Sequence, residues 1–294
     1  MKLLVSFFVI LAQCLIGQHD LLREKFFRSL HSTVENANAI VGVAIKDLKT
    51  GEQFFINENE VFPQASTIKI HILTEVYRQA MEGKFKLTDI KPFPPSARVG
   101  GSGILSLLGE KTVSMSIRDY CVLMINLSDN SATNFLIDVV GMENVNKTLV
   151  ANGATQTKLQ RRMMDYQAAK EGRENISTPK DVLTILEKMY HGTLVTLQAC
   201  NDMLEILKLE KDGALKRGIP PHVDIANKGG DIEGVRVDAG IVYLENNPYI
   251  ICVMTKMLLN DVDGPNIITA ISKETYHYFE RKANSNQYGR RIPK

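Results

Sequence analysis

The sequence has no tryptophan, only four cysteines and almost no net charge. Its 294 residues carry 35 Lys and Arg against 33 Asp and Glu, a formal net charge of +2. Nucleic-acid-binding proteins need a basic face, so this balance predicts no nucleic-acid partner. The six histidines form no H-E-x-x-H pair and do not pair with cysteine at ligand spacing. The sequence therefore implies no metal site and no cofactor.

Long apolar runs are absent beyond the N-terminus. A membrane-spanning helix needs about 20 apolar residues, so we expect no stable membrane insertion of the mature chain. The first residues, "MKLLVSFFVILAQCLIGQHD", place Lys2 before an apolar run of about fifteen residues, which is typical of a secretory signal peptide. We predict cleavage near residue 18 and a secreted or periplasmic protein. A lipid anchor on Cys14 is the weaker alternative, because Gln13 fits such a site poorly.

Removal of the signal peptide would leave three cysteines, an odd number that defines no disulfide framework. Each lies among apolar neighbours, as in "DYCVLMI" and "YIICVMT". Small apolar side chains of this kind are usually buried. We therefore expect buried free thiols at Cys121, Cys200 and Cys252.

Hydrophobic periodicity divides the chain into a helix, two strands, a block of helices, three strands and a last helix. The first helix covers 20–35, with an apolar stripe at Leu22, Phe26, Leu30 and Val34, and the last covers 265–282. A "DLKTGE" turn joins the first two strands, and "DIEG" and "NNP" turns separate the last three. The helical patterns of the block lie at about 67–82, 116–126, 131–138, 143–150, 179–190 and 196–208.

This order predicts an α+β fold, with an antiparallel sheet of about five strands flanked by the N- and C-terminal helices. The central helices would form an inserted all-helical domain. We place the signal peptide at 1–18, a discontinuous sheet domain at 19–63 and 212–294, and the helical domain at 64–211. The cleft between the two domains is the expected active site. We expect a monomer.

A serine and a lysine open the helical pattern in "FPQASTIKIHILTEVYRQA". Residues three apart share a helix face, so Lys69 lies within reach of the Ser66 hydroxyl. Two readings are open: Ser66 is a helix cap, or it is a nucleophile whose proton Lys69 accepts. The same spacing recurs at Ser177-Thr178-Pro179-Lys180, where we predict a structural cap with proline in the first turn. Spacing alone therefore does not choose.

Two further stretches favour the catalytic reading. Ser128-Asp129-Asn130 forms a polar break between two helical patterns, although a capped helix start would look the same. Lys228 ends a strand and precedes Gly229 and Gly230, which would let a substrate approach the strand edge, although a plain turn is the alternative.

Taken in order, Ser-x-x-Lys, Ser-Asp-Asn and Lys-x-Gly resemble the motif set of class A β-lactamases and the related penicillin-binding enzymes. The resemblance covers roughly residues 25 to 285 of this sequence. It implies a serine hydrolase acting on a small-molecule β-lactam or a peptide-like substrate.

The resemblance also implies roles for individual residues. Ser66 would be the acylated nucleophile, Lys69 its activator, and Ser128 the residue that passes a proton to the leaving amine. The substrate would be held by Asn130, Lys228, Gly230, Asp231 and Arg236. The backbone N–H groups of Ser66 and Asp231 would form the oxyanion hole. Arg236 is either a partner of Lys228 or an exposed strand charge.

The sequence departs from the family pattern at two positions. Gly229 stands where most members have a hydroxyl residue, which removes a hydrogen bond to the substrate carboxylate. In "TKLQRRMMDYQAAKEGREN", Arg161 matches the start of a catalytic loop, but Met163 stands where the deacylating glutamate is expected. A methionine cannot activate water. The nearest carboxylates are Asp165, Glu171 and Glu174, of which Asp165 is closest in sequence.

Four functions remain open at this stage. The protein is a secreted class A β-lactamase with a relocated base, or a penicillin-binding peptidase or esterase on the same fold that turns over slowly. A sensor acylated at Ser66 is disfavoured because no sensor domain accompanies the fold. A scaffold without chemistry is disfavoured by the intact set of Ser66, Lys69, Ser128, Asn130 and Lys228.

Overall fold

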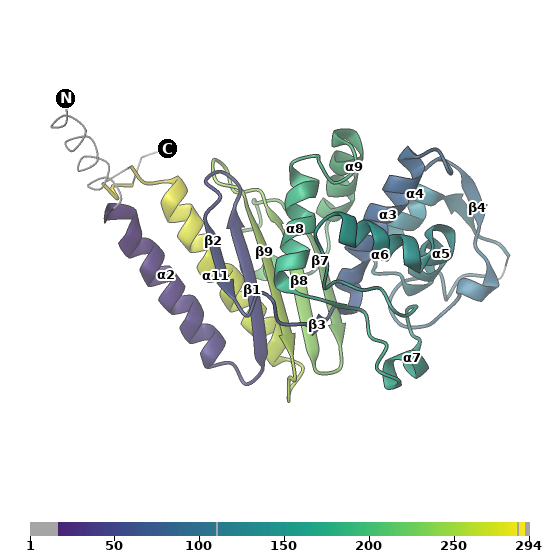
Figure 1. Ribbon diagram of the computed structural model, residues 1–294, viewed down its shortest axis with the longest axis horizontal. Helices are drawn as coiled ribbons and strands as arrows, with labels where there is room; N and C mark the ends of the chain where they lie inside the picture. Colours follow the sequence, from purple (N-terminus) through teal and green to yellow (C-terminus); the bar gives the residue numbers. More distant parts are fainter. Residues whose placement is uncertain (1–16, 110, 287, 292–294) are drawn as a thin grey trace, which may run out of the picture.

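A computed structural model describes residues 17–109, 111–286 and 288–291. A five-stranded antiparallel sheet lies at its centre, with the terminal helices on one side and the helical block on the other (Figure 1). This arrangement confirms the predicted α+β fold. Residues 1–16 of the predicted signal peptide lie outside the described residues, as does Cys14.

The sheet has the order β2-β1-β9-β8-β7, with every neighbouring pair antiparallel. Strand β7 is therefore an edge strand, next to the helical block. Its burial pattern leaves Gly229 and Asp231 less covered than their neighbours. The strands are β1 (Ile40–Asp47), β2 (Gln53–Ile56), β7 (Ile225–Ile232), β8 (Val235–Val242) and β9 (Tyr249–Lys256).

Helices α2 (Gly17–Glu35) and α11 (Asp263–Ala283) pack side by side on one face of the sheet (Figure 1). The predicted apolar stripe of α2 faces this layer, where Phe26 stacks on Tyr278 and meets Phe54 edge-on. Aromatic contacts of this kind add to the hydrophobic burial that fixes the two helices on the sheet.

The helical block contacts the other face of the sheet through α8 and α9 and surrounds α3. Ten of the thirteen residues of α3 are buried, so this helix forms the centre of the block. The elements of the block are η1 (Ala65–Ile68), α3 (Lys69–Met81), η2 (Pro95–Ala97), α4 (Ile117–Asn126), α5 (Asn130–Val140), α6 (Met142–Ala151), α7 (Tyr166–Lys170), α8 (Pro179–Tyr190) and α9 (Leu197–Lys208). The short helix α10 (Ala214–Arg217) packs instead on α11, through hydrogen bonds to the carbonyls of Ala214 and Leu215.

One apolar core runs from the sheet into the helical block, since Ala226, Val237 and Ile250 of the sheet belong to the same buried cluster as most of the block's apolar side chains. The proposed boundaries at 63/64 and 211/212 stay a prediction. Short strand pairs that the periodicity did not predict also tie the loops together. They are β3 (Phe62–Pro63) with β6 (Ile176–Ser177), and β4 (Ile90–Pro92) with β5 (Ser114–Ser116).

The second Ser-x-x-Lys stretch is structural, as predicted. The Thr178 hydroxyl accepts a hydrogen bond from the Asp181 N–H at the start of α8, and Pro179 occupies the first turn. Ser177 lies in β6, where its hydroxyl shares a 2.7 Å hydrogen bond with that of Thr157. Thr178 is therefore the cap.

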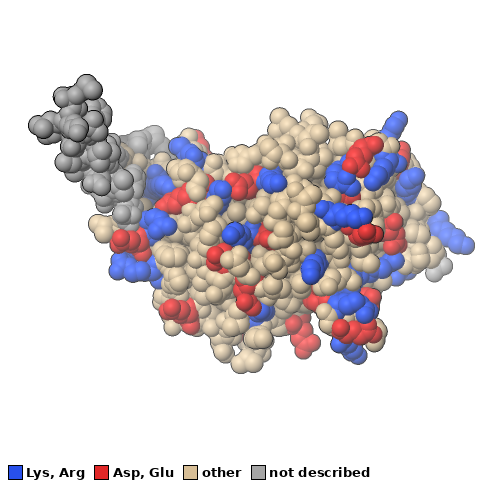
Figure 2. Space-filling model, viewed as in Figure 1, with Lys and Arg blue, Asp and Glu red and all other residues tan. Residues whose placement is uncertain are grey.

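Cys121, Cys200 and Cys252 are buried free thiols, as predicted. Within the described residues, no helix combines the length and apolarity needed to cross a membrane. Basic and acidic side chains are interspersed over the face drawn in Figure 2, without a large area of one sign.

Candidate active site

Ser66 lies in η1, directly before the buried helix α3. The preceding residue, Ala65, has a φ of +46°, a left-handed conformation that is costly for a residue with a side chain. A Cβ added at Gly230 of β7 would lie 2.6 Å from the backbone nitrogen of Ser66. Glycine is therefore required at 230, because it lets the edge strand approach the Ser66 backbone.

Lys69 has its amino group at the meeting point of three predicted site residues. Its Nζ lies 3.0 Å from the Ser66 Oγ and 3.0 Å from the Ser128 Oγ. It lies 2.8 Å from the carbonyl oxygen of Ser128 and 3.0 Å from the Asn130 Oδ1. The tertiary structure thus joins the first two motifs through one side chain.

Burial makes Lys69 unusual for a lysine. The residue is 0% exposed, and this desolvation, assisted by the positive charge of Lys228, holds its pKa well below the ordinary value of 10.5. A lysine with a strongly lowered pKa can be neutral and can accept a proton.

Ser128 occupies the tight turn between α4 and α5 with a φ of +51°. Asp129 fixes this turn: its Oδ1 accepts from the N–H of Ala132 and so caps α5, and its Oδ2 accepts from the N–H groups of Ile104 and Leu105. Asn130 is the first residue of α5. Its Oδ1 accepts from the Lys69 Nζ at 3.0 Å, and its Nδ2 donates to the carbonyl of Gly100 at 3.2 Å.

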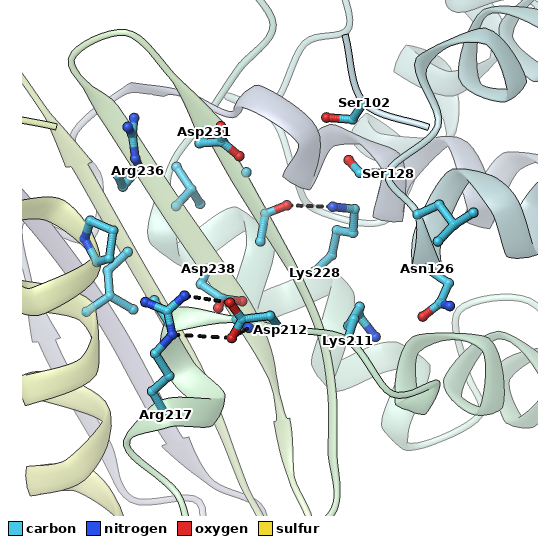
Figure 3. Close-up of a pocket in the computed structure, with 18 residues that line it drawn as sticks. Ser102, Asn126, Ser128, Lys211, Asp212, Arg217, Lys228, Asp231, Arg236 and Asp238 are labelled. Carbon is cyan, nitrogen blue, oxygen red and sulfur yellow. Dashed lines mark hydrogen bonds and ion pairs between the residues drawn. The ribbon is translucent and has the colours of Figure 1, made fainter. Parts of the chain in front are cut away.

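Lys228 points from β7 towards Ser128 (Figure 3). It is 4% exposed, and burial lowers its pKa to about 8. Within the described residues, the only hydrogen bond that its amino group donates goes to the carbonyl of Gly229, at 2.6 Å. An ammonium group has three donors, so most of its capacity remains for a ligand.

Two cavities of about 370 and 390 Å³ lie beside these residues. The first is lined by Ser128, Lys228 and the end of β7 (Figure 3). The second is lined by Ser66, Asn130 and the loop that contains Met163. Asp231 lines both, so the end of β7 forms the boundary between them. Within the described residues no group of three or more potential ligands could hold a metal ion.

Arg236 lies at the rim of the first cavity, but its guanidinium is already bound. One nitrogen donates to the carbonyls of Ile232 and Val235 at 2.7 Å, and another pairs with Asp261 at 3.2 Å. Its role in substrate binding stays a prediction.

The 161–174 loop places Met163 against the second cavity, with 7% of the residue exposed. Asn134 of α5 holds its backbone on both sides, accepting from the Met163 N–H at 2.8 Å and donating to its carbonyl at 3.2 Å. The following residue, Met164, has a φ of +65°. The backbone of residue 163 is therefore held in place beside the cavity that Ser66 also lines, but its side chain is not a base.

The nearby carboxylates of the loop serve other purposes. Asp165 is exposed and caps α7 by accepting from the Ala168 N–H at 2.9 Å. Glu171 pairs with Arg173 at the surface, and Glu174 pairs with Arg161 at 2.7 Å. None of the three lines either cavity. The structure thus gives no support to Asp165 as the deacylating base.

Sequence reasoning did not single out three residues near the site. Asn134 lies one helical turn after Asn130, a spacing that signals a shared face. Lys211, in the loop after α9, and Asp238, in β8, line the first cavity. No local pattern marks these two, because only the fold brings them beside Lys228.

Comparison with known proteins agrees with the resemblance seen in the sequence motifs. A family model described as "Beta-lactamase enzyme family" matches residues 25–279. Beta-lactamase CARB-3 of Pseudomonas aeruginosa is 28% identical over 222 residues, which cover 73% of this chain and 75% of that protein. The imipenem-hydrolyzing beta-lactamase of Enterobacter cloacae is 26% identical, with 74% of this chain and 77% of that protein covered.

Two solved structures are similar over most of the chain. A beta-lactamase from Sphaerobacter thermophilus DSM 20745 superposes with a TM-score of 0.81 at 28% identity, covering 87% of this chain and 97% of that one. The structure of PBP-A superposes with a TM-score of 0.81 at 26% identity, covering 87% of this chain and 96% of that one.

Proposed function

The chain belongs to the beta-lactamase enzyme family, and from this we propose that it is an exported serine hydrolase that opens β-lactam rings through an acyl-enzyme on Ser66 and releases the acyl group slowly. The observation that carries the proposal is the placement of the Lys69 Nζ between two serine hydroxyls and two acceptor oxygens.

The four contacts of Lys69 fit a neutral amine. The carbonyl of Ser128 and the Oδ1 of Asn130 can only accept, so they take the two N–H groups of the amine. The remaining lone pair faces the serine hydroxyls and can accept a proton from Ser66. As Ser66 attacks the substrate carbonyl, its proton passes to Lys69, and the C–N bond of the lactam breaks.

The backbone at the Ser66–β7 contact supports the charge that develops during attack. The N–H groups of Ser66 and Asp231 would donate to the carbonyl oxygen, and each such donor contributes about 3 kcal/mol to the transition state. The close approach permitted by Gly230 supports this role, because it lets β7 lie beside the Ser66 backbone nitrogen.

Ser128 would return the proton to the leaving nitrogen. Its Oγ lies 3.0 Å from the Lys69 Nζ, so one hydrogen-bonded step links the base to the leaving group. Because Ser128 lines the cavity of about 370 Å³, we assign that cavity to the departing part of the substrate and name it the leaving-group pocket. The cavity lined by Ser66 and Met163 would hold the acyl part.

Deacylation lacks an evident base. The carboxylates that line the acyl cavity are Asp231 of β7 and Glu233 in the turn after it, and neither is on the loop that carries Met163. A water molecule approaching from that loop would meet a thioether, which accepts protons poorly. The acyl-enzyme would therefore persist.

A second candidate function rests on Met163 as well. An enzyme that is acylated readily but deacylated slowly behaves as a penicillin-binding peptidase or esterase, whose natural substrate is a peptide-like amide or ester. The two candidates differ in the fate of the β-lactam adduct.

One experiment separates them. The mature protein is mixed with a chromogenic cephalosporin, and both colour release and intact mass are followed. Repeated turnovers on Ser66, even slow ones, support the β-lactamase, and a single stoichiometric adduct without a second turnover supports the peptidase or esterase. Absence of both overturns the proposal. Ser66→Ala must abolish the adduct, whereas Ser177→Ala must retain it, because Ser177 has the same spacing to a lysine but lies in β6.

Export is tested separately. The full chain and a chain beginning at residue 19 are expressed in a Gram-negative host, and the periplasmic fraction is assayed by intact mass. Cleavage near residue 18 in the periplasm supports export. Uncleaved full chain in the cytoplasm overturns it.

A further inference from the structure

The leaving-group pocket carries more acidic groups than a site for a lone carboxylate needs. Asp212, Asp231 and Asp238 line it together with Lys211, Lys228, Arg217 and Arg236. Two of the cations are already neutralised, because Arg217 pairs with Asp212 at 2.6 Å and Arg236 pairs with Asp261 at 3.2 Å.

The charges that remain are two lysines and two aspartates. Lys211 donates to the carbonyls of Leu207 and Leu209 at the end of α9, and Asp238 accepts from Leu215 and Asn227. Within the described residues, no ion pair links Lys211 or Lys228 to Asp231 or Asp238 within 4.0 Å. The pocket is therefore nearly balanced in charge, and its charged groups are spaced apart.

Asp231 is the acid best placed to meet a ligand. It is exposed, and its carboxylate makes no hydrogen bond or ion pair to any described residue. It lies on β7, three residues after Lys228, and lines both cavities (Figure 3). Gly229, between them, carries no side chain that could cover the pocket. A carboxylate drawn to Lys228 would meet a like charge at Asp231.

We propose that Asp231 sets the charge preference of the leaving-group pocket, so that the natural substrate is an ester or amide whose leaving group carries an ammonium. The inference rests on the proposed function, because it assumes acylation of Ser66. A cationic group would lie against Asp231, and Lys228 would serve the oxygen or carbonyl next to the scissile bond.

Matched thioesters test this preference. Two hippuryl thioesters share one acyl group and differ in the thiol released, which is cationic thiocholine or anionic mercaptoacetate. Acylation releases the thiol, so kcat/KM at pH 7 is followed with a thiol-reactive chromophore. The ratio of the two kcat/KM values isolates leaving-group charge, because any effect of Asp231 on the oxyanion acts equally on both substrates.

The wild type should prefer the thiocholine ester. Because an exposed charge pair is worth up to about 1 kcal/mol, Asp231→Asn should slow that ester about fivefold and speed the mercaptoacetate ester about fivefold. The preference of the wild type should weaken as salt is added, since exposed charges are screened. Asp231→Glu keeps the charge and should keep the preference.

Asp224→Asn is the matched control, because Asp224 is an exposed aspartate just before β7 that lines neither cavity. Its ratio should stay at the wild-type value. The inference is overturned, and the proposed function stands, if the ratio of the two kcat/KM values is the same in the wild type and Asp231→Asn. The same holds if that ratio changes equally in Asp231→Asn and Asp224→Asn. If neither thioester acylates Ser66 while the chromogenic cephalosporin does, the inference is overturned and the proposed function stands; if none of the three acylates Ser66, the proposed function itself fails.

Discussion

Replacing Met163 with glutamate should convert a slow deacylation into a fast one. The site is prepared for this change, because Asn134 holds the residue 163 backbone at 2.8 and 3.2 Å and the side chain already lines the cavity that contains Ser66. Methionine and glutamate are similar in volume, so the packing should survive. The new carboxylate would then face the ester carbonyl of the acyl-enzyme.

The magnitude follows from general base catalysis, which contributes about 10²–10⁴ to a rate. We expect the lower end, about a hundredfold faster deacylation, because the loop has not been shaped around a carboxylate. Only 7% of residue 163 is exposed, and burial raises a carboxyl pKa, which suits a general base near neutral pH. Arg161 offers little competition, since it is already paired with Glu174.

The assay is the lifetime of the penicillin adduct on Ser66, followed by intact mass after excess antibiotic is removed. Met163→Gln is the matched control, because it has the shape of glutamate without the base, and its adduct should last as long as in the wild type. The reasoning is refuted if Met163→Glu folds with an unchanged melting temperature and acylates normally, yet its adduct decays no faster than that of the control.

Three further outcomes are expected. Because Lys69 must be neutral to accept a proton, the acylation rate should rise with pH through its lowered pKa and then fall as Lys228 loses its charge near pH 8; a stopped-flow pH profile without a fall near pH 8 would contradict this assignment. Gly230→Ala should slow acylation about a hundredfold without unfolding the protein, because a Cβ there meets the Ser66 backbone nitrogen at 2.6 Å and displaces an oxyanion donor; unchanged acylation kinetics would refute it. Thr178→Ala should lower the free energy of unfolding by about 1 kcal/mol through loss of the α8 cap, with acylation unaffected; urea denaturation measures the first and adduct formation the second.

Most elements were predictable because their patterns are local. The stripe of α2 and the β-rich runs of the sheet depend on side-chain periodicity, and the predicted segments agree with the structure to within a few residues at each end. The short pairs β3–β6 and β4–β5 were missed. Strands of two or three residues have no measurable period, and they form only where distant loops meet.

The candidate site was predictable to a different extent. The motif order pointed to Ser66, Lys69, Ser128 and Lys228. In the structure Lys69 is hydrogen-bonded to both serines, and Lys228 points towards Ser128. Asp165 shows the opposite case. It was the carboxylate nearest to Met163 in sequence, but its side chain caps α7 and faces solvent. A residue that is close to Met163 in sequence need not point its side chain towards Ser66.

The sequence by itself determined the elements, the chemistry of the serine and lysine motifs, and the missing carboxylate at Met163, since each depends on residue identity and local spacing. Only the tertiary structure decided which Ser-x-x-Lys pair can be reactive. Ser66 and Ser177 share that spacing, but only Lys69 is buried between two serine hydroxyls under the field of Lys228. A pKa depends on the solvent and charges around a group, and residues far apart in the chain supply them.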